Sequence, residues 1–312
     1  MGGPSRPGRG LAAAAGLAER SLLLLVIAVA AAGVGLPGPG RVVSARDGID
    51  AALAVLVFAT GLSLRLADLA EVRTAWRRIA VVLAVSTAAL PMLAWAASQL
   101  ISDRVLRSGM QTVGVAPAEV ATVALCVIAG GDAALCAVIL AASTLITVLA
   151  AGPVLALAGA GATVPAAGLL GTLLVVVALP LAAGVGLRAA WAPGARADAT
   201  VRILTVVALL VLLWQVASQI RLDAGYLRVV GALAAFLAGS ALLGGLLSVR
   251  LPAGRAVAVL LPVTMRDFAV AAGIAATAFG PAAAAPLGVY GVFVLVAGSV
   301  ITQFAGRRAR PG

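Results

Sequence analysis

The chain has 312 residues, of which 63% are hydrophobic and only 11% are charged, whereas ordinary soluble domains are roughly 45 to 50% apolar. This composition excludes a soluble domain and indicates an integral membrane protein. The net charge of +11 comes from arginines that lie mostly in short loops and at the termini, a pattern that orients membrane helices and does not indicate nucleic-acid binding.

Apolar runs follow one another along the chain, and runs of about 17 to 25 residues suit helices that cross a hydrocarbon core of about 30 Å. Nothing resembles the alternating pattern of barrel strands. We therefore predict an all-α integral membrane protein with about ten transmembrane helices, and a turn at residues 37–40 after the first. The predicted spans are residues 21–36, 49–64, 79–99, 105–129, 133–158, 168–187, 203–220, 228–249, 256–279 and 286–304.

Arginine counts predict the orientation of these spans, because the side with more arginines is usually cytoplasmic. With the N-terminus inside, 15 arginines fall on the cytoplasmic side and 6 on the other. This predicts a multi-pass protein of the plasma (inner) membrane with both termini cytoplasmic. Five spans per half is an odd number, so two similar halves must be inverted relative to each other. We expect cytoplasmic segments at 1–20 and 305–312, and two inverted five-helix repeats at 21–158 and 159–304.

Two predicted spans contain a proline close to charged residues, where water cannot solvate a charge cheaply. Span four contains A-P-A-E at 116–119, and span nine contains L-P-V-T-M-R-D at 261–267. Pro117 and Pro262 lie 145 residues apart, which is nearly half of the chain. Paired interruptions in corresponding halves indicate a transporter's binding site. We expect the backbone of span nine to be unwound from Pro262 to Asp267.

The charged residues at these interruptions have several possible roles. Arg266 could hold a substrate carboxylate through a two-pronged hydrogen bond, because its guanidinium stays charged and is rigidly forked. Glu119 could bind a cation, carry a proton or form a structural ion pair with Arg266. Asp267 could cap the second half of span nine, balance charge, or act with Glu119 in proton coupling.

Three further polar residues, Gln111, Thr122 and Thr264, are candidates because they lie near the interruptions. No phosphate loop, dinucleotide fingerprint or Ser/His/Asp set is present, so we expect no enzymatic activity and no cofactor. The chain has no histidine, and its two cysteines lie in apolar segments, so we expect no metal site. The expected partners are a small-molecule substrate and the lipid bilayer, and the oligomeric state stays open. The candidate substrate- and ion-binding residues are Gln111, Pro117, Glu119, Thr122, Pro262, Thr264, Arg266 and Asp267.

Two motifs resemble the bile acid:sodium symporter superfamily. The segment G-L-S-L-R-L-A-D-L at 61–69 is similar to that family's Gly-Leu-x-Leu motif followed by an Asp, after the second span. The run G-G-D-A-A-L-C-A-V-I-L-A-A-S-T-L at 130–145 is similar to its Gly-Asp-x-Ala-Leu opening of span five. The resemblance implies a panel domain and a core domain, with broken spans four and nine crossing in the core near the sodium and substrate sites.

The chain departs from the family at those sites. Where the family carries Pro-Gly-Gly-Thr-x-Ser-Asn, this chain has residues 117–123. Val123 replaces the family's Asn, and only Thr122, at the position of the family's Ser, keeps a hydroxyl. In span nine the family's Glu-x-Gly-Met-Gln-Asn is replaced by residues 262–267, so its sodium-binding Glu is Pro262. We therefore predict coupling that does not strictly depend on sodium, with a proton as another possible coupling ion.

The resulting prediction is a secondary active transporter that moves a small organic anion or similar solute by alternating access. One alternative is an efflux permease for an oxyanion such as arsenite, since arsenite permeases share this architecture. Another is a non-transporting membrane scaffold or receptor whose internal charges only pair with each other.

Overall fold

The computed structural model describes residues 22–44, 48–63, 76–157, 166–190, 195–220 and 226–308, and every named element in these ranges is a helix. The all-α prediction is confirmed for this part of the chain. The predicted segment 1–20, the boundary between the predicted repeats at 158–159 and residues 309–312 of the tail lie outside the described residues. The elements are α2 (Leu22–Gly35), α3 (Pro37–Ser44), α4 (Gly48–Ser63), α6 (Trp76–Ser98), α7 (Arg104–Val115), α8 (Ala121–Ile128), α9 (Ala133–Leu157), α10 (Ala166–Leu173), the π-helical turn η2 (Leu174–Ala178), α11 (Leu179–Ala190), α12 (Ala195–Ala217), α13 (Tyr226–Ser248), α14 (Ala253–Thr264), α15 (Phe268–Phe279), the 3-10 turn η3 (Pro281–Ala284) and α16 (Ala285–Arg308).

Six of the described helices are long and apolar enough to cross a membrane, or seven if the bent pair α2 and α3 counts as one span. The protein is therefore a multi-pass helical membrane protein. Helices α4, α14 and α15 are apolar but shorter. The count of ten spans in two inverted repeats stays a prediction.

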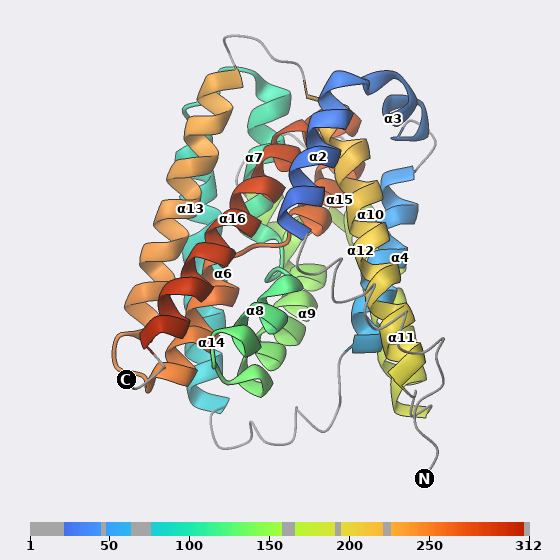
Figure 1. The fold of residues 1–312 in the computed structure, drawn as a ribbon. Coiled ribbons are helices and arrows are strands. Elements are labelled where there is room, and N and C mark those ends of the chain that lie inside the picture. Colours follow the sequence, from blue (N-terminus) through green and yellow to red (C-terminus); the bar gives the residue numbers. More distant parts are fainter. Residues whose placement is uncertain are drawn as a thin grey trace.

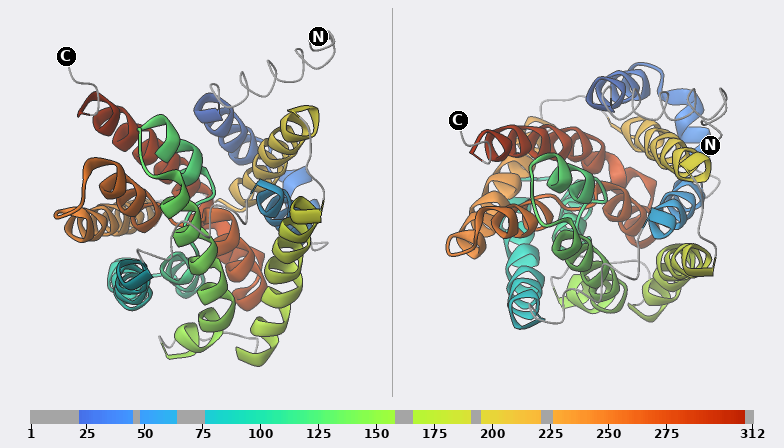
Figure 2. Two further views of the ribbon diagram at one scale, coloured as in Figure 1. Left: turned by 90° about the horizontal axis from the view of Figure 1, so that it is seen from below. Right: turned by 60° about the horizontal axis from the view of Figure 1, so that its bottom comes forward.

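The helices form two groups that lie side by side (Figures 1 and 2). In the flanking group, α4 packs against α11 and α12, and α12 packs against α2. In the crossing group, formed by α6 to α9 and α13 to α16, α6 packs against α7 and α13, and α13 packs against α14. The groups meet where α4 contacts α15 and where α16 contacts α2 and α12.

A close approach of two backbones joins α4 to α11 in the flanking group. A Cβ atom on Gly61 would lie 2.5 Å from the carbonyl oxygen of Leu181, and one on Gly184 would lie 2.4 Å from that of Phe58. Both distances are too short for a side chain. Small residues at such crossings allow membrane helices to pack backbone against backbone.

The segment expected as a turn at 37–40 is instead the start of the short helix α3, which lies at 91° to the preceding helix. Pro37 and Pro39 fit the first turn of a helix, because the N–H groups that prolines lack have no intrahelical partner there. The sharp bend falls between the two helices, at Leu36.

Candidate functional site

Two helical breaks lie within the crossing group. Residues 116–120 separate α7 from α8, and residues 265–267 separate α14 from α15. The first break follows from Pro117, because the residue before a proline is disfavoured in the helical conformation. Ala116 is accordingly extended, with ψ of 153°.

The second break begins later than expected from the sequence. Pro262 lies inside α14, which continues to Thr264. The prediction of unwound backbone from Pro262 onward is therefore wrong for residues 262–264, which are helical. The helix continues because only one N–H is missing, and the N–H of Met265 still donates to the carbonyl oxygen of Leu261 at 2.8 Å. The chain is extended at Met265 and restarts as a helix after Asp267, which caps α15.

The two breaks pair with each other as a short antiparallel bridge. The N–H of Glu119 donates to the carbonyl oxygen of Met265, and the N–H of Asp267 donates to that of Pro117, each over 2.9 Å. Unwound backbone in a membrane protein must find its partners within the protein. Each break therefore supplies hydrogen-bond partners to the other, which joins two segments about 145 residues apart in the chain.

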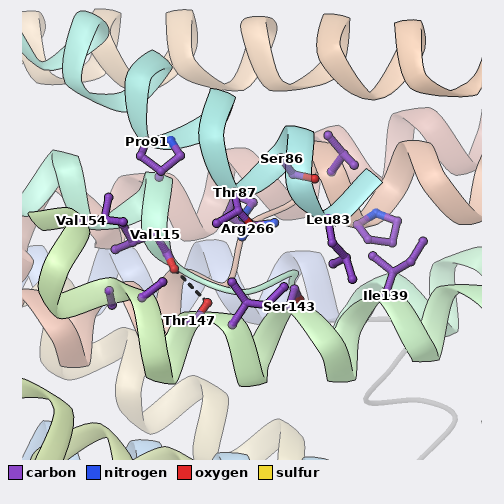
Figure 3. Close-up of a pocket in the computed structure, with 16 residues that line it drawn as sticks. Leu83, Ser86, Thr87, Pro91, Val115, Ile139, Ser143, Thr147, Val154 and Arg266 are labelled. Carbon is purple, nitrogen blue, oxygen red and sulfur yellow. Dashed lines mark hydrogen bonds between the residues drawn. The ribbon is translucent and has the colours of Figure 1, made fainter. Parts of the chain in front are cut away.

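Two hydroxyls of α9 bind the backbone of the first break. Ser143 accepts a hydrogen bond from the N–H of Ala118 at 3.0 Å. Thr147, one turn later, donates to the carbonyl oxygen of Val115 at 2.9 Å (Figure 3). These side chains hold the break open in a defined conformation, and we did not select either of them as a site residue from the sequence.

Two further hydroxyls bind the second break and the residue directly before it. The N–H of Arg266 donates to the phenolic oxygen of Tyr290 in α16 at 3.2 Å, and Ser240 of α13 donates to the carbonyl oxygen of Thr264 at 3.1 Å. Tyr290 is fully buried. A lone tyrosine within an apolar helix is the one signal in the sequence that could have identified it, since a buried phenol usually has a hydrogen-bond partner.

The two carboxylates lie at helix N-termini, where the backbone carries partial positive charge. Asp267 caps α15 by accepting two backbone N–H groups through Oδ1, each at 2.9 Å. The carboxylate of Glu119 faces the first N–H groups of both α8 and α15. Both side chains are buried, at 1% exposure for Glu119 and 3% for Asp267. Asp267 thus has the capping role that was one of its predicted alternatives.

The guanidinium of Arg266 is also buried and lies at the opposite kind of helix end. Its Nη2 donates to the carbonyl oxygen of Ala116, the C-cap residue of α7. Among the described residues, no nitrogen of Arg266 lies within 4.0 Å of a carboxylate oxygen of Glu119 or Asp267. The predicted alternative of a structural ion pair between Glu119 and Arg266 is therefore not observed.

Several buried polar atoms at the breaks and in neighbouring helices have no hydrogen-bond partner in the described structure. They include Glu119 Oε2, Arg266 Nε, Thr264 Oγ1 and Gln111 Oε1, and Gln215 of α12 carries a fifth. A buried polar atom without a partner costs roughly 1–3 kcal/mol, more if it is charged. Such atoms are expected where a ligand, an ion or water supplies the missing contact.

The remaining predicted residues lie at different distances from the paired breaks. The hydroxyl of Thr122 donates to the carbonyl oxygen of Glu119 at 2.5 Å and so closes the first turn of α8. Gln111 lies more than one turn before the first break and donates to Ser98 of α6 at 3.2 Å. The structure therefore brings all the predicted residues except Gln111 to the breaks or to the adjoining helical turns.

Arg266 reaches a narrow cavity between α6, α7, α9 and α14 (Figure 3). Its volume is about 20 Å³, which holds about one water molecule. Hydroxyls of Ser86 and Thr87 from α6 and of Ser143 and Thr147 from α9 line it together with apolar side chains. Within the described residues, no group of three or more potential metal-ligating side chains surrounds a common point.

Two broken helices that pair at their interruptions are a feature of membrane transporters built on discontinuous helices. The model of the sodium bile acid symporter family matches residues 51–230, more than half of the chain. The chain belongs to this family of membrane transporters, which confirms the family resemblance inferred from the sequence. The match includes the first break and ends before the second. A search of curated proteins found no matching sequence.

Proposed function

We propose that the protein is a secondary active transporter that moves a small organic anion by alternating access. The observation that carries this proposal is the buried guanidinium of Arg266, whose Nε has no partner in the described structure, at the point where two broken helices meet. In this proposal the ten predicted spans form two inverted five-helix repeats. The flanking and crossing groups correspond to the panel and the core.

An anion is the expected substrate because Arg266 can offer more than one N–H to a carboxylate. Nη2 is engaged by Ala116, while Nε has no partner among the described residues. A bidentate carboxylate would satisfy the unpartnered donor and compensate the buried charge. The cavity at Arg266 holds about one water molecule, so substrate entry requires helices to separate from the state described here.

The donor set at the crossing does not fit the sodium site that the family resemblance implies. Pro262 stands in place of the family's carboxylate, so this oxygen ligand is missing. Arg266 donates to a carbonyl oxygen at the break, the kind of ligand that a sodium ion would use, and its own positive charge would repel one. We therefore propose that transport does not strictly require sodium, and that Glu119, whose Oε2 has no partner in the described structure, is available to carry a proton.

Reconstituted liposomes test this proposal. Uptake of taurocholate, benzoate, pyruvate and succinate is measured under a sodium gradient, a proton gradient, and neither. We expect uptake of at least one anion to persist without sodium, and Arg266→Ala to reduce it at least tenfold. Arg104→Ala, which removes an exposed arginine outside the site, is the matched control and should transport normally. Uptake that needs a sodium gradient, or that survives Arg266→Ala unchanged, contradicts the proposal.

A further inference from the structure

A second cavity lies at the end of the crossing group where α6, α9 and α14 begin and α13 ends. Its volume is about 290 Å³, close to the lower limit of about 300 Å³ for small-molecule pockets. The inner wall is apolar and buried. It is formed by Ile79, Val82, Leu135, Ile139 and Val259.

Three arginines form the rim of this cavity. Arg77 and Arg78 project from the first turn of α6, and Arg255 projects from the first turn of α14; all three are exposed. Arg255 lies 3.9 Å from Asp132, at the limit of an ion pair. In the ranges that the structure describes, no carboxylate pairs with Arg77 or Arg78. Counted over the described residues, the rim therefore has a net positive charge.

The start of α6 also carries a marker of the membrane surface. Trp76 is 60% exposed, and the guanidinium carbon of Arg77 lies 5.5 Å from the centre of its ring. Exposed tryptophans at the ends of membrane helices prefer the level of the lipid headgroups. Val81, which lines the cavity one turn further into the helix, is 56% exposed. The cavity thus has a basic rim at the headgroup level and an apolar wall that continues toward the bilayer core.

From this juxtaposition of three arginines with an apolar cavity, we infer that the protein binds one anionic phospholipid here. The phosphate contacts the arginines, and the upper part of an acyl chain lies along the apolar wall. A water-soluble anion would pair with the arginines but leave the apolar wall without a partner. A zwitterionic lipid would cover the apolar wall, but its headgroup has no net negative charge to compensate the arginines. Basic pockets between membrane helices are known to bind anionic headgroups.

This inference is independent of the proposed transport function, because its three arginines belong neither to the paired breaks nor to the cavity at Arg266; Ile139 is a wall residue that the two cavities share. The rim lies at the end of the molecule that arginine counting places in the cytoplasm, where the leaflet is rich in anionic lipids. The bound lipid would hold the start of α6 against the start of α14, the first half of a broken helix.

Thermal unfolding and native mass spectrometry of the purified chain in detergent test the inference. The probes are dioleoylphosphatidylglycerol, dioleoylphosphatidylcholine, glycerol 1-phosphate and inorganic phosphate. We expect phosphatidylglycerol alone to raise the melting temperature and to remain bound as one molecule per chain. Because an arginine near an anionic surface contributes about 1 kcal/mol, Arg77→Gln with Arg78→Gln should weaken this binding by roughly 30-fold.

The control is Arg104→Gln with Arg250→Gln, which removes the same charge from two exposed arginines that do not line the cavity. This variant should bind phosphatidylglycerol as the unchanged protein does. An equal loss of binding in the control would mean that only overall surface charge matters, and would overturn the inference. Equal stabilisation by phosphatidylcholine would also overturn the inference. Equal stabilisation by glycerol 1-phosphate or inorganic phosphate would overturn it too, because the arginines would then bind a free anion.

Discussion

Each charged side chain at the paired breaks lies at a helix end of opposite partial charge. Glu119 and Asp267 face the N-termini of α8 and α15, and Arg266 binds the carbonyl oxygen of Ala116 at the C-terminal end of α7. Such arrangements contribute about 0.3–1 kcal/mol each, and up to about 2 kcal/mol when partly buried. They offset part of the burial cost but leave Glu119 Oε2 and Arg266 Nε without partners. We infer that Asp267 is mainly structural, whereas Glu119 and Arg266 are available to a ligand.

Neutralising each carboxylate without changing its shape separates these roles. Glu119→Gln removes the charge whose oxygen has no partner, and we expect it to reduce anion uptake in liposomes at least tenfold. Asp267→Asn keeps an oxygen that can cap α15, because asparagine is as good an N-cap as aspartate. We expect it to retain at least half of the uptake and nearly the same melting temperature.

Asp267→Ala serves as the control for the cap itself. Loss of an N-cap destabilises by about 0.5–2 kcal/mol, so this variant should melt at a lower temperature than Asp267→Asn. Equal losses of uptake in Glu119→Gln and Asp267→Asn would refute the division of roles. If Glu119→Gln combined with Arg266→Met folds normally and changes no measured flux, the scaffold alternative is favoured over transport.

The charged residues of this site were predictable from the sequence, whereas the hydroxyls that support it were not. Glu119 and Arg266 stood out because charges within apolar spans are rare and expensive. Ser143 and Thr147 did not stand out, because such side chains mostly bond to their own helix. Ser143 does bond to Leu140 as well as to the broken segment. Which hydroxyl reaches a neighbouring backbone depends on helix rotation, which a single sequence does not specify.

At the scale of elements, prolines indicated where helices are interrupted but not where the interruptions begin. Pro117 stops α7 directly, whereas α14 passes through Pro262 and ends two residues later, at Thr264. The difference arises because the end of α14 is set by tertiary contacts. The chain leaves the helix where it pairs with the first break and where Asp267 restarts it.

The crossing of α4 and α11 gives a prediction about helix packing. Gly184→Ala places a Cβ atom 2.4 Å from a carbonyl oxygen of α4, which cannot move aside as a flexible side chain could. We expect a destabilisation of about 1–3 kcal/mol, as for other overpacked sites, measured as a lower melting temperature and a smaller monodisperse fraction.

Gly186→Ala is the matched control for this change. It lies in the same helix, and a Cβ atom there meets nothing within 4 Å. Because alanine favours helix more than glycine does, this variant should be unchanged or slightly more stable. Similar melting temperatures for the two variants would show that α4 and α11 are farther apart than described.

At the scale of the whole molecule, the helix ends predicted to be cytoplasmic lie together. The start of α6, the end of α11, the turn between α13 and α14 and the end of α16 all lie at the lower end in Figure 1. The starts of α7 and α13 lie at the opposite end. The arginine-rich connections can share one side of the membrane only if these helix ends lie together. The distribution of arginines in the sequence predicted this arrangement.

Single cysteines at the two ends test which side faces the cytoplasm. We predict that Ser102→Cys, beyond the end of α6, reacts with a membrane-impermeant maleimide in intact cells. Val249→Cys, at the end of α13, should react only after the membrane is permeabilised. Neither substitution changes the arginine balance that is expected to set the orientation, and both positions are exposed. The unchanged protein provides the background, because Cys126 and Cys136 are buried. The opposite labelling pattern would place the lipid-binding rim and both termini outside the cell. It would refute the orientation that we predicted because 15 arginines fall on one side of the membrane and 6 on the other.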